Sequence, residues 1–241
     1  MLRADNDPLR SCRCWGGRGG RRITYTMAMI SGHDDFLVFA NTLNVVCWNN
    51  LRSTRSIPSA GFVAAVEDPK FRDAYLNGTA NYAPFVPNNA RSSAFLSLFT
   101  VNAQSSYEVE YDAEHLRFHE FPLLPSRFSA VYAFGSDEDC QRAHERYGWP
   151  LSELRRFRLV PHLLNRLPRA NMEIVSLMRS VYPKASWTRE QRDALWRHYW
   201  SGGGSLAVEI PAVRDNTPGW QSAQSGEIWE YLIEGKLELL D

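Results

Sequence analysis

The sequence has little cysteine, and the cysteines it has follow no pattern that would hold a metal or a disulfide framework. There are four, at Cys12, Cys14, Cys47 and Cys140. Their spacing matches no zinc finger or zinc ribbon, and small secreted domains that rely on disulfides carry a denser, regular set. We therefore expect no structural metal, no disulfides and a reducing compartment, the cytoplasm.

Long apolar runs and an excess of charge are also missing. No run approaches the ~20 apolar residues of a membrane-spanning helix, and the basic N-terminus lacks the apolar centre of a signal peptide. Lys plus Arg and Asp plus Glu both number 27, so the net charge indicates no class of partner. With 241 residues, 44% of them hydrophobic, the chain can bury an ordinary core. We expect a soluble protein that does not enter a membrane.

Common nucleotide and hydrolase motifs are absent as well. The sequence has no Walker A loop, no Gly-x-Gly-x-x-Gly fingerprint and no Gly-x-Ser-x-Gly elbow. Gly202 to Gly204 has no lysine after it and predicts a flexible connector. His115 and His119 are four residues apart and could share a helix face, but no third ligand stands at a suitable distance. The sequence therefore predicts no metal site.

The N-terminal segment differs in composition from the rest. Its first 22 residues contain six arginines against two aspartates, with little that could pack. A segment so charged and so poor in apolar residues cannot bury enough surface to fold alone. We expect residues 1–26 to be a disordered basic leader, or to precede a natural start at Met27 or Met29, and residues 27–241 to form a single domain.

The middle of the chain predicts a strand, a helix and a second strand. The short aromatic run from Phe128 to Phe134 suits a buried strand. Ser136 is a suitable N-cap for a helix over 137–147, and Gly148 ends it. Residues 154–160 alternate basic and apolar side chains, as a half-exposed strand does.

Further along, apolar residues recur at helical spacing over 171–182 and predict a helix. A capping box of Thr188 and Gln191 should start another, which runs from Arg189 to about Tyr199. The remaining segments are less regular. We expect strands over 205–210, 228–233 and 236–240, and a long loop over 211–226. Residues 50–95 should form loops with one short helix near 68–76, and the runs over 36–48 and 94–101 could each be strand or helix. Together these elements predict an α+β fold.

Two residues stand out as candidates for chemistry. Arg127 directly precedes the aromatic strand, and its fork of donors could hold a diphosphate, with Ser126 adding a hydroxyl contact. The alternative is an arginine that pairs with a carboxylate to organise a turn. Glu230 lies between Trp229 and Tyr231, where a carboxylate could bind a ribose hydroxyl and stabilise a cationic sugar transition state. The alternative is a surface glutamate on an edge strand.

A basic segment follows the predicted helix over 137–147. Arg155, Arg156 and Arg158 are close together in the sequence, with Arg166 and Arg169 soon after. Clustered arginines can contact the phosphates of a nucleic acid, although solvated surface charge is the commoner explanation. We therefore take the first three as candidate contacts to a nucleic-acid substrate.

The segment from Glu114 to Phe134 carries Glu-x-x-Arg, Phe-Pro and Pro-Ser-Arg steps before the aromatic strand, and Tyr-Trp-x-Gly and Trp-Glu-x-Leu-x-x-Gly steps follow at 199–202 and 229–235. This series resembles a bacterial domain family of unknown function. It is similar to divergent ADP-ribosyltransferases, a superfamily that includes nucleic-acid-modifying toxins of defence and toxin–antitoxin systems. The resemblance covers about residues 110–241.

The resemblance implies a split mixed β-sheet with flanking helices and a cleft for NAD⁺. Glu230 would be the catalytic carboxylate, Arg127 and Ser126 would bind the cofactor, and Tyr132 would stack on the nicotinamide. Ile228 stands where arginine-specific relatives carry a further glutamate, which favours a nucleic-acid base, or a protein side chain other than arginine, as target. The resemblance to toxins of this kind also implies an antitoxin partner. The alternatives are a non-catalytic nucleic-acid-binding module and a partner-binding protein of a defence operon.

Overall fold

The computed structural model describes residues 11–12, 25–26, 34–41, 43–82, 98–214 and 217–240. The chain divides into two units, Met1–Asp34 and Asp35–Asp241. In the first unit, β1 (Ser11–Cys12) pairs antiparallel with β2 (Tyr25–Thr26). Apart from these two short strands, the predicted leader over 1–26 lies outside the described residues.

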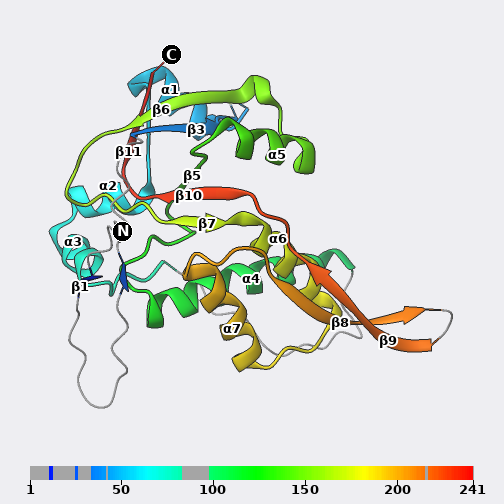
Figure 1. Ribbon diagram of the computed structural model, residues 1–241. Coiled ribbons are helices and arrows are strands. Elements are labelled where there is room, and N and C mark those ends of the chain that lie inside the picture. Colours follow the sequence, from blue (N-terminus) through cyan, green and yellow to red (C-terminus); the bar gives the residue numbers. More distant parts are fainter. Residues whose placement is uncertain are drawn as a thin grey trace, which may run out of the picture. The chain divides into compact units, whose positions relative to one another are not determined.

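The second unit contains two main sheets (Figure 1). A four-stranded sheet has the order β3-β6-β11-β4, with strands Asp35–Phe39, Leu154–Leu159, Lys236–Leu239 and Ser56–Pro58. A three-stranded sheet has the order β5-β10-β7, with strands Val131–Ala133, Trp229–Ile233 and Arg169–Asn171. An isolated bridge from Leu37 to Phe134 connects the two sheets, and a second bridge, from Arg166 to Glu234, continues the register of β7 with β10.

The α+β class predicted from the sequence is confirmed, but the expected mixed sheet is wrong. Every strand pair in the described part of the chain is antiparallel. The last two strands, β10 and β11, are consecutive in the chain and yet belong to different sheets. The chain passes between the sheets at Gly235, where a Cβ atom would lie 2.7 Å from the Leu159 side chain. A side chain there would crowd Leu159, which lies on β6 of the four-stranded sheet, and Asn165.

Seven α-helices of the described residues surround the sheets: α1 (Val45–Thr54), α2 (Ala60–Glu67), α3 (Pro69–Leu76), α4 (Leu98–Glu120), α5 (Asp137–Tyr147), α6 (Met172–Val181) and α7 (Arg189–Trp200). Two 3₁₀ turns, η2 (Leu151–Glu153) and η3 (Tyr182–Lys184), complete them. In Figure 1, α4, α6 and α7 lie on one side of β10 and β7, and α4 contacts both of the other two helices. No helix in the described ranges is both long enough and apolar enough to cross a membrane.

The predicted helix ends are confirmed where they depend on local hydrogen bonds. The Ser136 hydroxyl accepts from the backbone N–H of Asp139 at 3.1 Å, and Gly148 closes α5 at φ 69°. The capping box of Thr188 and Gln191 is present at the start of α7. Asn171 caps α6 through its side chain. These interactions span two or three residues, so the sequence carries all the information that they need.

Other segments differ from the prediction. Residues 36–48 contain both a strand and the start of a helix. Residues 98–101 begin the 23-residue helix α4, and 94–97 lie outside the described residues. The predicted loop over 211–226 is wrong, because β8 (Ala207–Arg214) and β9 (Thr217–Gln224) form a long antiparallel hairpin. It projects from the rest of the unit in Figure 1. A two-stranded ribbon has only edge strands, and edges tolerate the Pro and Gly residues that suggested a loop.

The core lies on both faces of β3. Phe36 and Val38 join a cluster with Phe157 and Ile233, whereas Leu37 joins a second cluster on the opposite face. Alternate strand residues point to opposite faces, so β3 is covered on both sides. The second cluster includes Phe134, Met172 and Ile228. Phe134 and Met172 also line a pocket.

Candidate functional site

A pocket of about 410 Å³ opens between the sheets and helix α6. Within the described residues, its wall consists of Phe39, Asn41, Arg127, Tyr132, Phe134, Trp149, Pro150, Glu153, Met172, Val175, Ser176, Arg179 and Glu230. The volume falls in the range of small-molecule sites in proteins. Arg127, Tyr132 and Glu230, three of the residues singled out in the sequence, therefore meet in one place.

One end of the pocket is polar and centres on Arg127. Its Nε donates to Glu110 of α4 at 2.8 Å, and its Nη1 donates to the Tyr199 hydroxyl of α7 at 2.6 Å. The same Nη1 donates to Glu230 of β10 at 3.2 Å. The Arg127 side chain is only 7% exposed, so the guanidinium joins two helices and a strand inside the protein. The arrangement matches the alternative considered from the sequence, in which this arginine pairs with a carboxylate.

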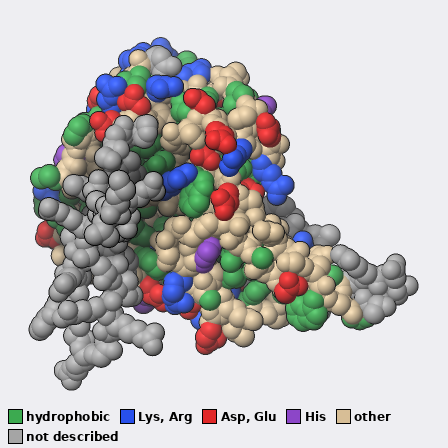
Figure 2. Space-filling model, in the orientation of Figure 1, with side chains coloured by type: hydrophobic (Ala, Val, Ile, Leu, Met, Phe, Trp, Pro, Cys, Tyr) green, Lys and Arg blue, Asp and Glu red, His purple; other side chains and the backbone are tan. Residues whose placement is uncertain are grey.

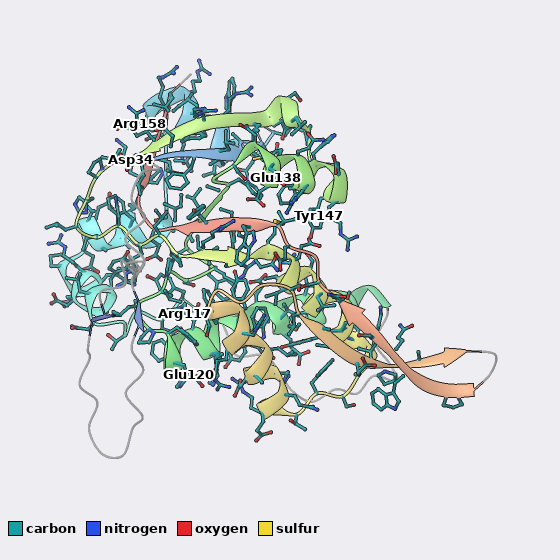
Figure 3. The ribbon with its side chains drawn as sticks, in the orientation of Figure 1. Asp34, Arg117, Glu120, Glu138, Tyr147 and Arg158 are labelled. Atoms are coloured by element: carbon teal, nitrogen blue, oxygen red, sulfur yellow. The ribbon has the colours of Figure 1, made fainter. Side chains whose placement is uncertain are left out.

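The Glu-x-x-Arg and Pro-Ser-Arg steps explain how Arg127 is held in place. Arg117 of α4 (labelled in Figure 3) forms a buried ion pair with Glu114 at 2.7 Å and donates to the carbonyls of Pro122 and Leu124. The Ser126 hydroxyl donates to Glu114 at 2.8 Å. A buried guanidinium with all these acceptors fixes the turn after α4. That turn delivers Arg127 to the pocket.

The two carboxyl groups around Arg127 have displaced pKa values. Burial raises the pKa of Glu230 above its ordinary value, although the Arg127 guanidinium acts in the opposite direction. Burial would also raise the pKa of Glu110, but Arg127 and Arg179 together hold it below its ordinary value. Two carboxyl groups whose pKa values are shifted in opposite directions can take different roles in acid–base chemistry.

Arg127 keeps its own charge. Burial by itself would lower the pKa of the guanidinium, but the oxygens of Tyr199, Tyr132, Glu110 and Glu230 raise that pKa above its usual range. The Tyr132 ring lies 5.2 Å from the guanidinium carbon, and its hydroxyl donates to the Arg127 carbonyl at 2.7 Å. Tyr132 thus forms a wall of the pocket and supports the Arg127 backbone at the same time.

Of Glu227, Glu230 and Glu234, the second lines the pocket and the other two are used elsewhere. The Glu227 carboxylate accepts from the backbone N–H of Ser205 at 2.9 Å. Glu234 is fully buried, accepts from the Ser129 hydroxyl, and lies 4.0 Å from Arg166. The choice of Glu230 over its neighbours is a prediction from the sequence, and of these three glutamates it is the one in the pocket wall.

Arg179 is a pocket residue that the sequence did not single out. It lies on α6 with its side chain 50% exposed, and its Nη2 donates to Glu110 at 2.6 Å. Unlike Arg127, it has donors directed to open space as well as to a protein partner. The only signal in the sequence was its position near the end of an amphipathic helix, where cations are common.

The other end of the pocket is aromatic. The rings of Phe39 and Trp149 lie 5.3 Å apart between centroids, and Phe39 and Phe134 lie 5.7 Å apart. Tyr147, labelled in Figure 3, stacks on Trp149, with the ring centroids 5.3 Å apart and an angle of 27° between the ring planes. A flat ligand ring has several aromatic partners here. The sequence did not predict this wall, since its members come from separate elements.

The remaining predicted site residues lie outside the pocket wall. Ser126 is fully buried and bonded to Glu114, so the structure does not place it where it could contact a cofactor. Arg155 and Arg158 lie on β6, where the first donates to backbone carbonyls and the second pairs with Asp35 at 2.8 Å. Arg156 and Arg158 are exposed on the same face of that strand.

No protein-family model matches the chain, and no curated protein matches it in sequence. Within the described ranges, no group of three or more His, Cys, Asp or Glu residues is arranged to hold a metal ion. The pocket combines a buried carboxyl, a half-exposed arginine and an aromatic wall, which together suit a ligand with a hydroxyl, an anionic group and a flat ring.

Proposed function

We propose that this protein is an NAD-dependent ADP-ribosyltransferase that modifies a macromolecular target. The observation that carries the proposal is the contact between Arg127 and Glu230, 103 residues apart, in a pocket with an aromatic wall. Two of the motifs on which the family resemblance rests, Pro-Ser-Arg and Trp-Glu-x-Leu-x-x-Gly, supply these residues. The two sheets that separate at Gly235 agree with the split sheet that the resemblance implies.

The groups in the pocket suit NAD⁺. Arg179 offers exposed donors to the diphosphate, and Trp149, Phe39 and Phe134 offer ring faces to a base. When bound, NAD⁺ supplies an electrophilic sugar carbon that carries a cationic leaving group. Glu230 accepts a hydrogen bond from a ribose hydroxyl and, as a carboxylate, stabilises the positive charge that develops on the sugar. Arg127 orients that carboxylate through its Nη1.

The proposed target is a nucleic-acid base rather than a protein arginine. A second carboxylate two residues before Glu230 would serve to activate a guanidinium, but Ile228 occupies that position and is 5% exposed. Arg156 and Arg158 are exposed on β6 and provide phosphate contacts for a nucleic acid. In Figure 2, basic and acidic side chains are interspersed over the visible described surface. The proposed interaction therefore depends on local contacts rather than on a wide basic face.

Transfer of label from NAD⁺ tests the proposal. The protein is incubated with NAD⁺ labelled in its adenylate part and with RNA, DNA or protein, and the products are identified by mass spectrometry. Glu230→Gln should lower the labelling rate at least about 100-fold, because a group that stabilises transition-state charge is lost. The matched control is Glu227→Gln, whose carboxylate bonds to the loop at Ser205. Equal labelling by wild type and Glu230→Gln would sink the catalytic role of Glu230.

The alternative is a module that binds a nucleic acid or a protein partner without turning over NAD⁺. One observation favours it, because the Arg127 guanidinium already has three protein partners, Glu110, Tyr199 and Glu230. Such a network can serve stability alone. Calorimetry with NAD⁺ separates the two proposals, since the transferase should release or absorb heat on binding and the module should not.

A further inference from the structure

Ser176 is a pocket residue with a constrained hydroxyl group. It lies on α6, three residues before Arg179, so the two side chains are about one helical turn apart on the pocket side. Its Oγ lies 2.6 Å from the Tyr147 hydroxyl. Through Tyr147, which stacks on Trp149, Ser176 is connected to the aromatic wall of the pocket.

The directions of the hydrogen bonds among Ser176, Tyr147 and Glu173 follow from the buried carboxyl group of Glu173. Tyr147 donates to the carboxylate of Glu173, which is 4% exposed and lies 3.4 Å from the guanidinium of Arg146. The Tyr147 hydroxyl has a single proton, and because it is donated to Glu173 it is not available to Ser176. Ser176 must then supply the proton of its bond with Tyr147. The hydroxyl of Ser176 therefore offers the pocket lone pairs and no proton.

The surroundings of Ser176 favour a flat ring beside that acceptor. Trp149 lies against Tyr147 on one side and is a member of the pocket wall with Phe39 and Phe134. Burial also raises the pKa of Tyr147 to about 12, so its proton stays on the phenol at neutral pH. A ligand that stacks on these rings meets an oxygen that accepts and does not donate.

We propose that Ser176 is the residue that selects the nicotinamide ring, by accepting a hydrogen bond from the N–H of its carboxamide group. This inference rests on the proposed function and extends it to the choice of leaving group. Glu230, in the same pocket, is proposed to contact the ribose that carries the nicotinamide. The ring attached to that ribose must therefore lie nearby, whereas adenine lies beyond the diphosphate. Tyr147 and Glu173 are positioning residues that hold the Ser176 proton away from the ligand.

An NAD⁺ analogue with an acetyl group in place of the carboxamide gives the test. It keeps the carbonyl and the ring but has a methyl group where nicotinamide has its N–H donor. The wild-type protein should bind NAD⁺ about tenfold more tightly than this analogue, since the analogue leaves the Ser176 oxygen unpaired. In Ser176→Ala, the two dissociation constants measured by calorimetry should agree within about twofold, because the acceptor is gone.

Two further variants separate selection from structure. Ser180→Ala is the matched control, because Ser180 is on the same helix and its exposed hydroxyl bonds to the Leu177 carbonyl. It should keep the tenfold preference. Tyr147→Phe removes the acceptor of the Ser176 proton, so the serine can then donate as well as accept. This variant should bind both dinucleotides and lose most of the preference.

The outcomes are distinct. A preference that survives in Ser176→Ala, with the variant folded as judged by its thermal transition, overturns the role of Ser176. Equal binding of both dinucleotides by wild type overturns the same inference and leaves the transferase proposal standing. Failure of wild type to bind either dinucleotide overturns both. A preference that is lost in Ser176→Ala and kept in Ser180→Ala supports the inference.

Discussion

Glu110 and Glu230 contact different nitrogens of the same guanidinium, that of Arg127, and their pKa values move in opposite directions. Glu110 accepts from Nε at 2.8 Å and also from Arg179, which keeps it ionised. Glu230 accepts from Nη1 at 3.2 Å, and burial raises its pKa. The first carboxyl balances the local positive charge, and the second remains available to a ligand.

Removal of the Glu110 charge should destabilise the protein strongly. Glu110→Gln leaves the buried Arg127 with a weaker partner, and breaking a buried ion pair costs about 3 kcal/mol of unfolding free energy. Denaturant unfolding measures the change. The control is Glu138→Gln on α5 (Figure 3), whose pair with Arg142 is exposed and should contribute below about 1 kcal/mol. A Glu110 effect no larger than the control would contradict a structural ion pair.

The raised pKa of Glu230 predicts two pH dependences. Its ionised form is needed for the proposed chemistry, so the acid limb of the rate profile should lie above the ordinary value of 4.5. The folded state also binds this proton more tightly than the unfolded chain does. The contribution of Glu230 to stability is therefore present below pH 4.5 and is lost as the pH rises through the raised pKa. Relative to Glu230→Gln, wild type should lose stability over that interval, as measured by denaturant unfolding at a series of pH values.

Arg179 should act on binding rather than on stability. Its side chain is half exposed, so Arg179→Ala should change the free energy of unfolding by less than about 1 kcal/mol. The loss of a charged phosphate contact should weaken NAD⁺ binding about tenfold, with a smaller salt dependence than wild type shows. Arg142→Ala on α5 is the matched control, with a similarly exposed side chain that is 48% accessible. Calorimetry at two salt concentrations measures the affinities. If both variants bind NAD⁺ as tightly as wild type does, Arg179 does not contact the phosphates.

Trp149 should contribute a stacking surface. Trp149→Leu keeps an apolar residue in the wall but removes the flat ring, and loss of ring stacking costs about 1–3 kcal/mol of binding free energy. The affinity for NAD⁺ should therefore fall about tenfold or more. The control is Trp220→Leu on the β8–β9 hairpin, where the side chain is 71% exposed and outside the pocket wall. If the two variants bind NAD⁺ with equal affinity, Trp149 does not stack on the ligand.

Prediction from the sequence succeeded where the deciding interactions are short in range. The ends of α5 and α7 depend on Ser136, Gly148 and Thr188, each of which bonds within its own turn. It failed for the hairpin over 207–224, since strand pairing there outweighs the local preference of Pro and Gly. It also could not divide β10 and β11 between two sheets, because that division depends on pairing with strands far away in the chain, β5 and β7 for β10 and β6 and β4 for β11.

The sequence by itself determined the α+β class, the capped helices and the choice of Arg127 and Glu230 as residues to examine. Only the tertiary structure decided which partners surround them. The partners of Arg127 are 17, 72 and 103 residues away in the chain, and Ser176 and Arg179 reach the pocket through the packing of α6. Such contacts follow from how several elements pack together, and no local pattern encodes them. The same packing buries Ser126 with Glu114 and leaves Glu230 at the pocket wall.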